Sequence, residues 1–387
     1  MASITENDLK EICQILWSWD FCIGCLQKTV CQVKACPNER MRRLSRYFDY
    51  GRIIFDVYAA ETPPAKLRKL RNLVLKAIGF IRSSPSSIRA EFLQRLANSR
   101  EGADEDVEEL DRALMMAIKL MFMTNCGHDN QKMEVLESGL FMRSWRGEFG
   151  LDNYIVDSFP KTDHPSLNEK NSNKADIIKA ALQAKKLKKH ANLSFSPTDD
   201  IRNHLRLDHQ TGVVQIFHYT SFLKEQLRIT QHMRSETEAH IVEYMKAGAL
   251  PRQLVLEVLD SIQKVLFPIN DDQSYALLVS MTSSKGGSFD PDCIRFESEE
   301  FRSAEESDVA YYYFGARLME LYQESENPRP RGLVAEWLER RSGARYAMLA
   351  TLIGVFIAIL LGLAGLVVSS YQTYIAYQQW KHAISKS

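Results

Sequence analysis

An uncharged apolar run constrains the fold of this chain more than any other feature. It extends from Tyr346 to Val368, and 13 of its 23 residues are Leu, Ile, Val or Phe. As a helix the run would be about 35 Å long at ~1.5 Å per residue, enough to cross a hydrocarbon core of ~30 Å. Helices of soluble cores rarely run this long without a polar face. The sequence therefore predicts a transmembrane helix over 346–368, followed by a short tail over 369–387.

Residues on either side of this run predict its orientation. Arginines precede it, including Arg340, Arg341 and Arg345 at the expected membrane interface, whereas two lysines follow it. Since basic residues favour the cytosolic side of a span, we expect the bulk of the chain in the cytosol, as in a tail-anchored protein. Beyond the run, aromatic side chains recur every third residue, as expected at the opposite lipid–water interface. These are Tyr371, Tyr374, Tyr377 and Trp380.

Small residues within the run suggest that two such helices associate. Gly354, Ala358 and Gly362 lie four residues apart, and this spacing lets two helix backbones approach closely. A homo-oligomer formed through this face is one interpretation. Glycine and alanine are also common in ordinary membrane helices, so the spacing alone does not decide between the two.

The beginning of the sequence gives an expectation about location. MASITENDLKEICQ carries acidic residues where a secretory signal would have basic ones followed by an apolar stretch. We therefore expect no cleaved leader, reduced cysteines and an intracellular membrane, whose organelle the sequence does not specify.

Helical periodicity dominates the rest of the chain and predicts a mainly α protein. Residues 1–124 are interpreted as a basic helical domain, because the first 100 residues hold 17 Lys and Arg against 9 Asp and Glu. Periodicity fails over 125–175, which is interpreted as an irregular linker, and returns over 176–345 as a second, mainly helical domain. Within this second domain HLRLDHQTGVVQIFHY predicts a small β-hairpin with its turn at 209–212.

An amphipathic helix after Pro63 and Pro64 has a basic outer face that could attract anionic lipid headgroups. A solvated face, or pairing with the acidic residues of 101–111, explains the same charges. For a membrane-anchored chain the lipid bilayer is the expected partner, and no nucleic acid is expected. The candidate lipid-facing residues are Lys66, Arg68, Lys69, Arg71 and Lys76.

The cysteines and histidines are candidate metal ligands. Five of the seven cysteines lie in the first 36 residues: Cys13, Cys22, Cys25, Cys31 and Cys36. A Cys-x-x-Cys pair with further thiols can bind zinc, form a redox pair or carry a lipid. The apolar surroundings, WSWDFCIGCLQKTV, favour buried cysteines acting as small apolar side chains, so we expect no metal and no cofactor. His204, His209, His218, His232 and His240 are likewise expected to be ordinary core or surface residues, with His218 the one of most interest.

Motifs of common enzyme classes are not found. The sequence contains no Gly-x-Ser-x-Gly, no phosphate-binding Gly-x4-Gly-Lys-Ser/Thr, no dinucleotide fingerprint and no His-Glu-x-x-His. The paired carboxylates Asp199-Asp200 and Asp271-Asp272 are interpreted as helix caps. These observations favour a non-enzymatic interaction or regulatory module with a protein partner. An oligomeric membrane-active or transport-associated protein and a membrane-tethered enzyme are the alternatives.

Several stretches carry a resemblance: PTDDIRNHLRLDHQTGVVQIFHYTSFLKEQL, PRQLVLEVLDSIQKVLFPINDDQS, FDPDCIRFE, and the segment from RGLVAEWLERRSGARY through YQQWKH. Together, over residues 197–382, they resemble a group of uncharacterised predicted membrane proteins of filamentous fungi with a single C-terminal span. The resemblance implies a fungal source and a cytosol-facing membrane protein. It supplies no catalytic residue.

Overall fold

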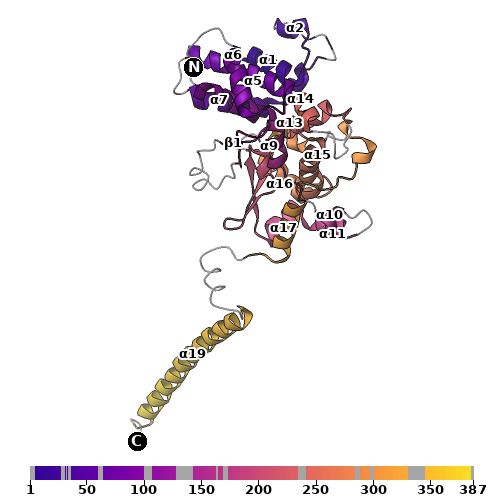
Figure 1. The fold of residues 1–387 in the computed structure, drawn as a ribbon. Coiled ribbons are helices and arrows are strands. Elements are labelled where there is room, and N and C mark those ends of the chain that lie inside the picture. The colour runs from indigo at the N-terminus through magenta and orange to yellow at the C-terminus, as the bar shows by residue number, and fades with distance from the viewer. Residues whose placement is uncertain are drawn as a thin grey trace. The chain divides into compact units, whose positions relative to one another are not determined.

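The computed structural model describes residues 5–27, 31, 33, 36–59, 64–99, 107–127, 143–162, 164–168, 173–233, 241–283, 288–296, 300–329 and 345–384 (Figure 1). The chain divides into two compact units, Met1–Pro328 and Arg329–Ser387, and each is described by itself. We call the first unit the body.

The N-terminal part of the body is helical. Its first helix begins with a capping box, in which the Thr5 hydroxyl accepts from the Asp8 N–H while the Asp8 carboxylate accepts from the Thr5 N–H at 2.8 Å. It ends at Ser18, which adopts a left-handed conformation (φ 54°). The helices are α1 (Glu6–Trp17), α2 (Ile23–Leu26), α3 (Asn38–Arg43), α4 (Ser45–Ala59), α5 (Pro64–Ser83), α6 (Arg89–Asn98) and α7 (Val107–Phe122).

Helices α5 and α7 pack against each other and form the centre of this part. The predicted apolar stripe of α5 is confirmed, since each of its side chains is buried; they are Leu67, Leu70, Val74, Ile78 and Ile81. Full burial of such a side chain contributes ~1.5–3 kcal/mol, so the stripe fixes the orientation of α5 on α7. Its basic residues are thereby directed away from the core.

The range predicted as an irregular linker, 125–175, contains short regular elements. Leu151 of α9 and Leu167 of α10 belong to the hydrophobic core. The elements that begin in this range are β1 (Cys126–Gly127), β2 (Arg143–Ser144), α9 (Leu151–Ser158), α10 (Pro165–Asn168) and α11 (Asn173–Ala181).

A small sheet follows, with strand order β3-β5-β4. The predicted hairpin is confirmed, because β4 (Leu207–Asp208) pairs antiparallel with β5 (Val213–Phe217). The third strand, β3 (Ser194–Thr198), pairs parallel with β5 and was not predicted. Its sequence, SFSPT, contains Pro197, which lacks an N–H for a sheet ladder and is tolerated here because β3 is an edge strand.

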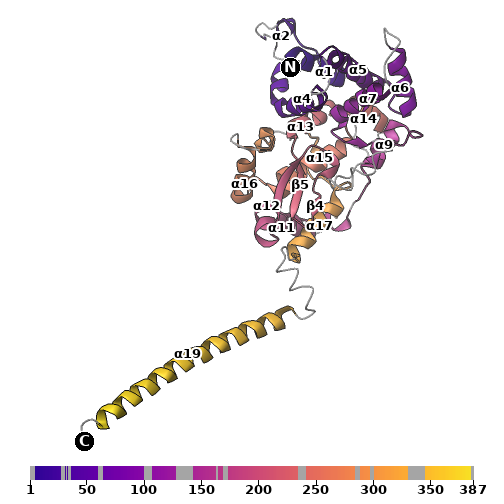
Figure 2. The same ribbon diagram turned by 90° about the vertical axis from the view of Figure 1, so that its left-hand side faces the viewer.

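Helices surround this sheet and complete the body. In both views α1, α5, α6 and α7 gather at one end of the body, and α11 and α17 lie at the other (Figures 1 and 2). One continuous hydrophobic cluster extends from Leu9 to Leu321. The remaining elements are α12 (Ala184–His190), η1 (Ile201–Asn203), α13 (Thr220–Ile229), α14 (Ile241–Lys246), α15 (Arg252–Asp260), the π-helical η2 (Ser261–Leu266), α16 (Asp272–Thr282), η3 (Pro291–Ile294), η5 (Ala304–Glu306) and α17 (Gly315–Glu326).

The second unit contains one long helix, α19 (Arg345–Ile384). The fold class predicted from the sequence is thus confirmed: the protein is mainly α, with a small sheet and an apolar C-terminal helix.

Candidate functional site

Helix α19 is the one helix among the described residues that is long and apolar enough to cross a membrane. All residues of its candidate span, Thr351–Trp380, are exposed. Large side chains such as Leu361 and Val367 are more than half exposed. A contiguous apolar surface of this size is unusual on a monomeric soluble protein and indicates a surface that lipid or protein covers.

The predicted pairing residues lie on this helix with open space around them. A Cβ added to Gly354 or Gly362 would meet nothing within 4 Å, and Ala358 is exposed. The structure contains a single chain, so helix pairing stays a prediction.

The predicted interface residues are partly described. Arg345 is the first residue of α19, whereas Arg340 and Arg341 lie outside the described residues. The aromatic side chains Tyr371, Tyr374, Tyr377 and Trp380 are all exposed. Tyr374 accepts a hydrogen bond from Gln378 at 2.9 Å, and the rings of Tyr377 and Trp380 are 6.5 Å apart. Their place at a lipid–water interface stays a prediction.

The basic face of α5 divides into two kinds of residue. Lys66, Arg68 and Lys69 are exposed. Arg71 forms an ion pair with Asp8 of α1, and the Lys76 ammonium donates to the carbonyl of Ser99 at 2.6 Å. The last two therefore help to hold the body together, and Lys66 and Arg68 are better placed to meet a lipid surface.

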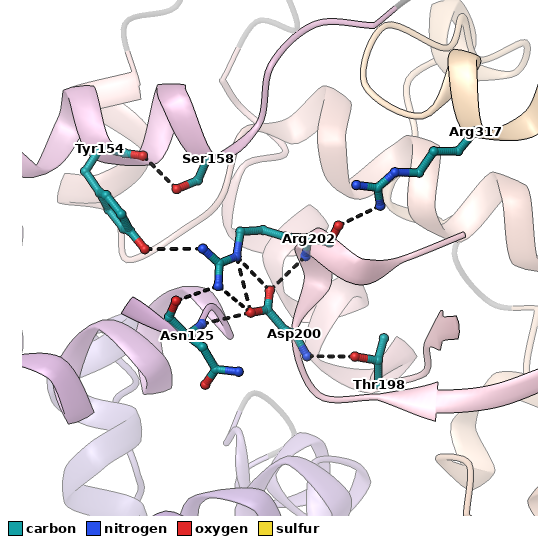
Figure 3. Close-up of polar contacts among 7 residues, drawn as sticks. All are labelled: Asn125, Tyr154, Ser158, Thr198, Asp200, Arg202 and Arg317. Carbon is teal, nitrogen blue, oxygen red and sulfur yellow. Dashed lines mark hydrogen bonds and ion pairs between the residues drawn. The ribbon is translucent and has the colours of Figure 1, made fainter. Parts of the chain in front are cut away.

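A buried ion pair between Asp200 and Arg202 connects several elements of the body (Figure 3). The Arg202 guanidinium donates to Asp200 at 2.6 and 3.0 Å and to the carbonyl of Asn125, just after α7, at 2.5 Å. The Asp200 carboxylate also accepts from the backbone N–H of Arg202, so its predicted role as a cap is confirmed for η1. From α17, Arg317 donates to the backbone carbonyl of Arg202 at 2.6 Å. The pair thus joins the ends of α7, η1 and α17.

A second buried carboxylate, Glu257 of α15, holds the loop before α17. It accepts from the backbone N–H groups of Tyr312, Tyr313 and Phe314 at 2.7–3.0 Å and from the Gln253 amide at 3.1 Å. Burial raises the pKa of Glu257 to about 7, although these donors act in the opposite direction. Because Glu257 is fully buried and saturated by these donors, its role is structural.

The histidines that the structure describes have protein partners where they are buried. His204 accepts at Nδ1 from the Phe217 N–H at 3.2 Å, and its Nε2 lies 2.7 Å from the Ser261 hydroxyl. Burial, with Arg317 nearby, holds the pKa of His204 well below its usual range, so the ring is neutral. His218 accepts at Nδ1 from the Asp290 N–H at 2.9 Å. His240 lies outside the described residues.

A small recess beside α3 and α13 is lined by basic and acidic side chains. Its volume is about 30 Å³. Arg40 pairs with Glu225 at 2.9 Å and Lys224 with Asp292 at 2.6 Å, so charges in the recess are already matched within the protein.

The N-terminal cysteines depart most from what their sequence pattern favours. Cys13 is fully buried and fits the expectation of a small apolar residue, but Cys31 is exposed. The structure brings Cys22, Cys25, Cys31 and Cys36 together, and their sulfur atoms all lie within 4.8 Å of one another. The Cys-x-x-Cys pair was the sequence signal that could have led to this cluster.

No family model, curated protein or solved structure matches the chain. Its function is therefore inferred from its own residues.

Proposed function

We propose that this chain is a single-pass, tail-anchored protein of an intracellular membrane, whose body acts on the cytosolic face as a non-enzymatic interaction or regulatory module. The observation that carries the proposal is helix α19, which is 40 residues long and contains an exposed candidate span, Thr351–Trp380, of high mean hydropathy. Leu, Ile, Val and Phe contribute roughly −0.3 to −0.6 kcal/mol each to insertion at the centre of a span. The 13 such residues of 346–368 would together contribute on the order of −5 kcal/mol.

The orientation follows from the arginines that precede the span. Arg329, Arg331, Arg340, Arg341 and Arg345 lie on its N-terminal side, and positive charge near a span favours the cytosol. The body would then face the cytosol, with the exposed Lys66 and Arg68 of α5 placed to meet anionic headgroups.

An interaction role is supported by the way the body uses its buried charges. Asp200 with Arg202, Arg252 with Glu306, and Lys224 with Asp292 are ion pairs in which both partners are buried. Because the charged groups of these three pairs are already matched with each other, we assign them a structural role and not one in acid–base chemistry. We propose a protein partner for the body and lipid, or a second copy of the chain, for α19.

Membrane extraction tests the anchor. The full chain should stay with the membrane in alkaline carbonate, which removes peripheral proteins. The double change Ile357→Lys with Leu361→Lys places two charges at the middle of the span, at ~2.5–3.5 kcal/mol each, and should release the chain. Gln372→Lys with Gln379→Lys adds the same charge beyond the apolar run and should leave it bound. Release of the unchanged chain would refute the anchor.

Affinity purification from the native membrane tests the interaction role. The full chain, solubilised in mild detergent, should recover a defined protein partner in a fixed ratio. A chain in which the body is replaced by an unrelated soluble domain should still be bound to the membrane but should no longer recover the partner. If both chains recover the same proteins, the body is not the interaction module.

A further inference from the structure

The sulfur cluster of Cys22, Cys25, Cys31 and Cys36 has the dimensions of a tetrahedral metal site. The Cys22 and Cys31 sulfur atoms are 3.8 Å apart, and those of Cys25 and Cys36 are 3.6 Å apart. Four sulfur ligands at ~2.3 Å from one zinc ion stand about 3.8 Å from each other in a regular tetrahedron. All pairs in the cluster lie within 4.8 Å, so small side-chain adjustments would bring the four to that arrangement.

We propose that these four cysteines bind a structural Zn²⁺ ion. Soft thiolate ligands in a tetrahedral arrangement select zinc among the common divalent ions. The protein would supply all four ligands, and a closed site of this kind stabilises structure and leaves no position for a reacting water. Binding converts four thiols and one Zn²⁺ into a complex with a net charge of about −2 and releases up to four protons.

The backbone around the cluster holds the ligands in short turns. Cys22 is the N-cap residue of α2 and Cys25 lies within this helix, so the two sulfur atoms come from one helical turn. Cys36 donates its backbone N–H to the Val33 carbonyl at 3.0 Å, which forms a turn just before α3. Two thiols from one helical turn and one from just before the next helix thus reach a common point with Cys31, as four ligands of a closed tetrahedral site must.

A neighbouring lysine supports the backbone of the cluster. The buried ammonium of Lys10 on α1 donates to the backbone carbonyl of Cys25 at 2.7 Å. The same ammonium pairs with Glu6 at 3.1 Å, so the effect of the contact is to tie the backbone of a ligand residue to α1. Metal sites are commonly supported by such outer contacts, which fix the ligand residues and balance charge.

The segment that leads into the cluster is anchored to the body. Trp19 donates through its indole N–H to Glu225 of α13 at 3.1 Å, and Phe21 packs against Trp19 with ring centroids 5.9 Å apart. A zinc ion would therefore connect the start of α3 to a segment that is already fixed on α13 and α1. Its role would be to stabilise the packing of these N-terminal segments on the body.

Disulfide bonding and simple burial fit the geometry of the cluster less well than zinc does. A disulfide requires a sulfur–sulfur distance of about 2.05 Å, far below the distances found here, and two separate disulfides would not require four sulfur atoms to converge. Burial of apolar cysteines does not account for Cys31, which is exposed.

Elemental analysis of the full chain in detergent tests the proposal. The chain is purified under reducing conditions without chelator from cells supplied with zinc, and we expect about one Zn²⁺ per chain. Cys31→Ser removes an exposed ligand and should lower the zinc content at least tenfold. Cys13→Ala, a matched change of a nearby cysteine outside the cluster, should leave it unchanged.

Two further measurements separate loss of the ligand from loss of the fold. Cys31→His supplies a nitrogen ligand and should restore zinc binding. Co²⁺ bound to the unchanged chain should give the absorption of a tetrahedral site with thiolate charge transfer, and Cys31→His should weaken the charge-transfer part. A reduced full chain that takes up no zinc, a Cys31→Ser variant with full zinc content, or native disulfides within the cluster found after rapid alkylation would each overturn the proposal.

Discussion

The buried ion pair of Arg252 and Glu306 gives the sharpest prediction about stability. The Arg252 guanidinium is 2% exposed and forms two parallel hydrogen bonds to Glu306, at 2.5 and 2.7 Å. It also donates to the backbone carbonyls of Leu227 at 2.7 Å and Phe301 at 2.5 Å. Arg252→Met keeps much of the aliphatic volume and removes every one of these donors.

The magnitude follows from what the substitution leaves behind. Removing one partner of a buried pair costs ~3–5 kcal/mol, because the other charge stays buried without compensation. Each orphaned carbonyl adds about 1 kcal/mol or more. With two orphaned carbonyls, we therefore expect the free energy of unfolding of the body to fall by about 5–7 kcal/mol, a large part of the ~5–15 kcal/mol typical of a folded domain.

The assay is urea unfolding of residues 1–328, followed by circular dichroism and tryptophan fluorescence. The matched control is Arg52→Met, because Arg52 forms an ion pair with Asp49 at 2.6 Å in which both side chains are more than two-fifths exposed. That change should cost at most ~1 kcal/mol. Equal losses for the two variants would refute the reasoning, since they would show that burial does not decide the cost.

The same pair predicts a pH dependence. Burial raises the pKa of Glu306, but hydrogen bonds and the charge of Arg252 outweigh it, and the net pKa is lowered. A carboxyl whose pKa is lowered on folding stabilises the protein above its unfolded pKa of about 4.3, and this stability is lost as the pH falls through the folded pKa. In Arg252→Met this contribution should vanish. The difference from the unchanged chain should therefore be largest near neutral pH and shrink in acid.

Further predictions concern the membrane helix, the basic face of α5 and two glycines of the body. Gly354→Ile with Gly362→Ile should abolish detergent-resistant dimers, because the added bulk would hold the helix backbones apart. The body should sediment with anionic vesicles at low salt and leave them at high salt if α5 binds lipid. Gly248→Ala should destabilise the body by more than ~1 kcal/mol, because φ is +72° and a Cβ would collide with the backbone carbonyl oxygen of Leu16. Gly79→Ala within α5 should instead stabilise it by ~0.4–1 kcal/mol, since a Cβ there meets nothing within 4 Å.

The predictions on dimers, vesicle binding and Gly248 each have an outcome that would contradict them. If dimers persist when Gly354 and Gly362 are both changed to isoleucine, self-association takes place through a surface other than this face of α19. Vesicle binding that does not depend on lipid charge, or that survives reversal of the exposed basic residues of α5, would discard the lipid-binding face. A Gly248→Ala body as stable as the unchanged one would show that the chain shifts locally and relieves the contact.

Local features of the fold could be predicted because each one is encoded within a few residues. The 3.6-residue period of α5 predicts its buried face, and the β-branched run Val213–Phe217 after a glycine predicts the hairpin. Strand β3 could not be predicted in this way, since it carries Pro197 and its pairing with β5 depends on a distant segment. Parallel pairing leaves no turn signal in the sequence.

The candidate sites likewise differ in how far the sequence alone predicts them. An apolar span and its aromatic and arginine flanks are properties of sequence order, so they could be proposed directly. The pair of Arg252 and Glu306 joins residues 54 positions apart, and nothing in the sequence of either indicates the other. The cysteine cluster is intermediate. Cys22 and Cys25 have the spacing of a metal-binding pair, but their convergence with Cys31 and Cys36 is seen only in the structure.

The central proposal is that helix α19 anchors the chain in a membrane and leaves the body in the cytosol. Mapping with N-glycosylation acceptors in microsomes tests this most directly, because modification occurs only on the lumenal side. One acceptor is placed before the body and one, with a flexible spacer, after Ser387. We predict modification of the C-terminal acceptor alone. Modification of the N-terminal acceptor would contradict the orientation, and modification of neither, with release by alkaline carbonate, would contradict the anchor itself.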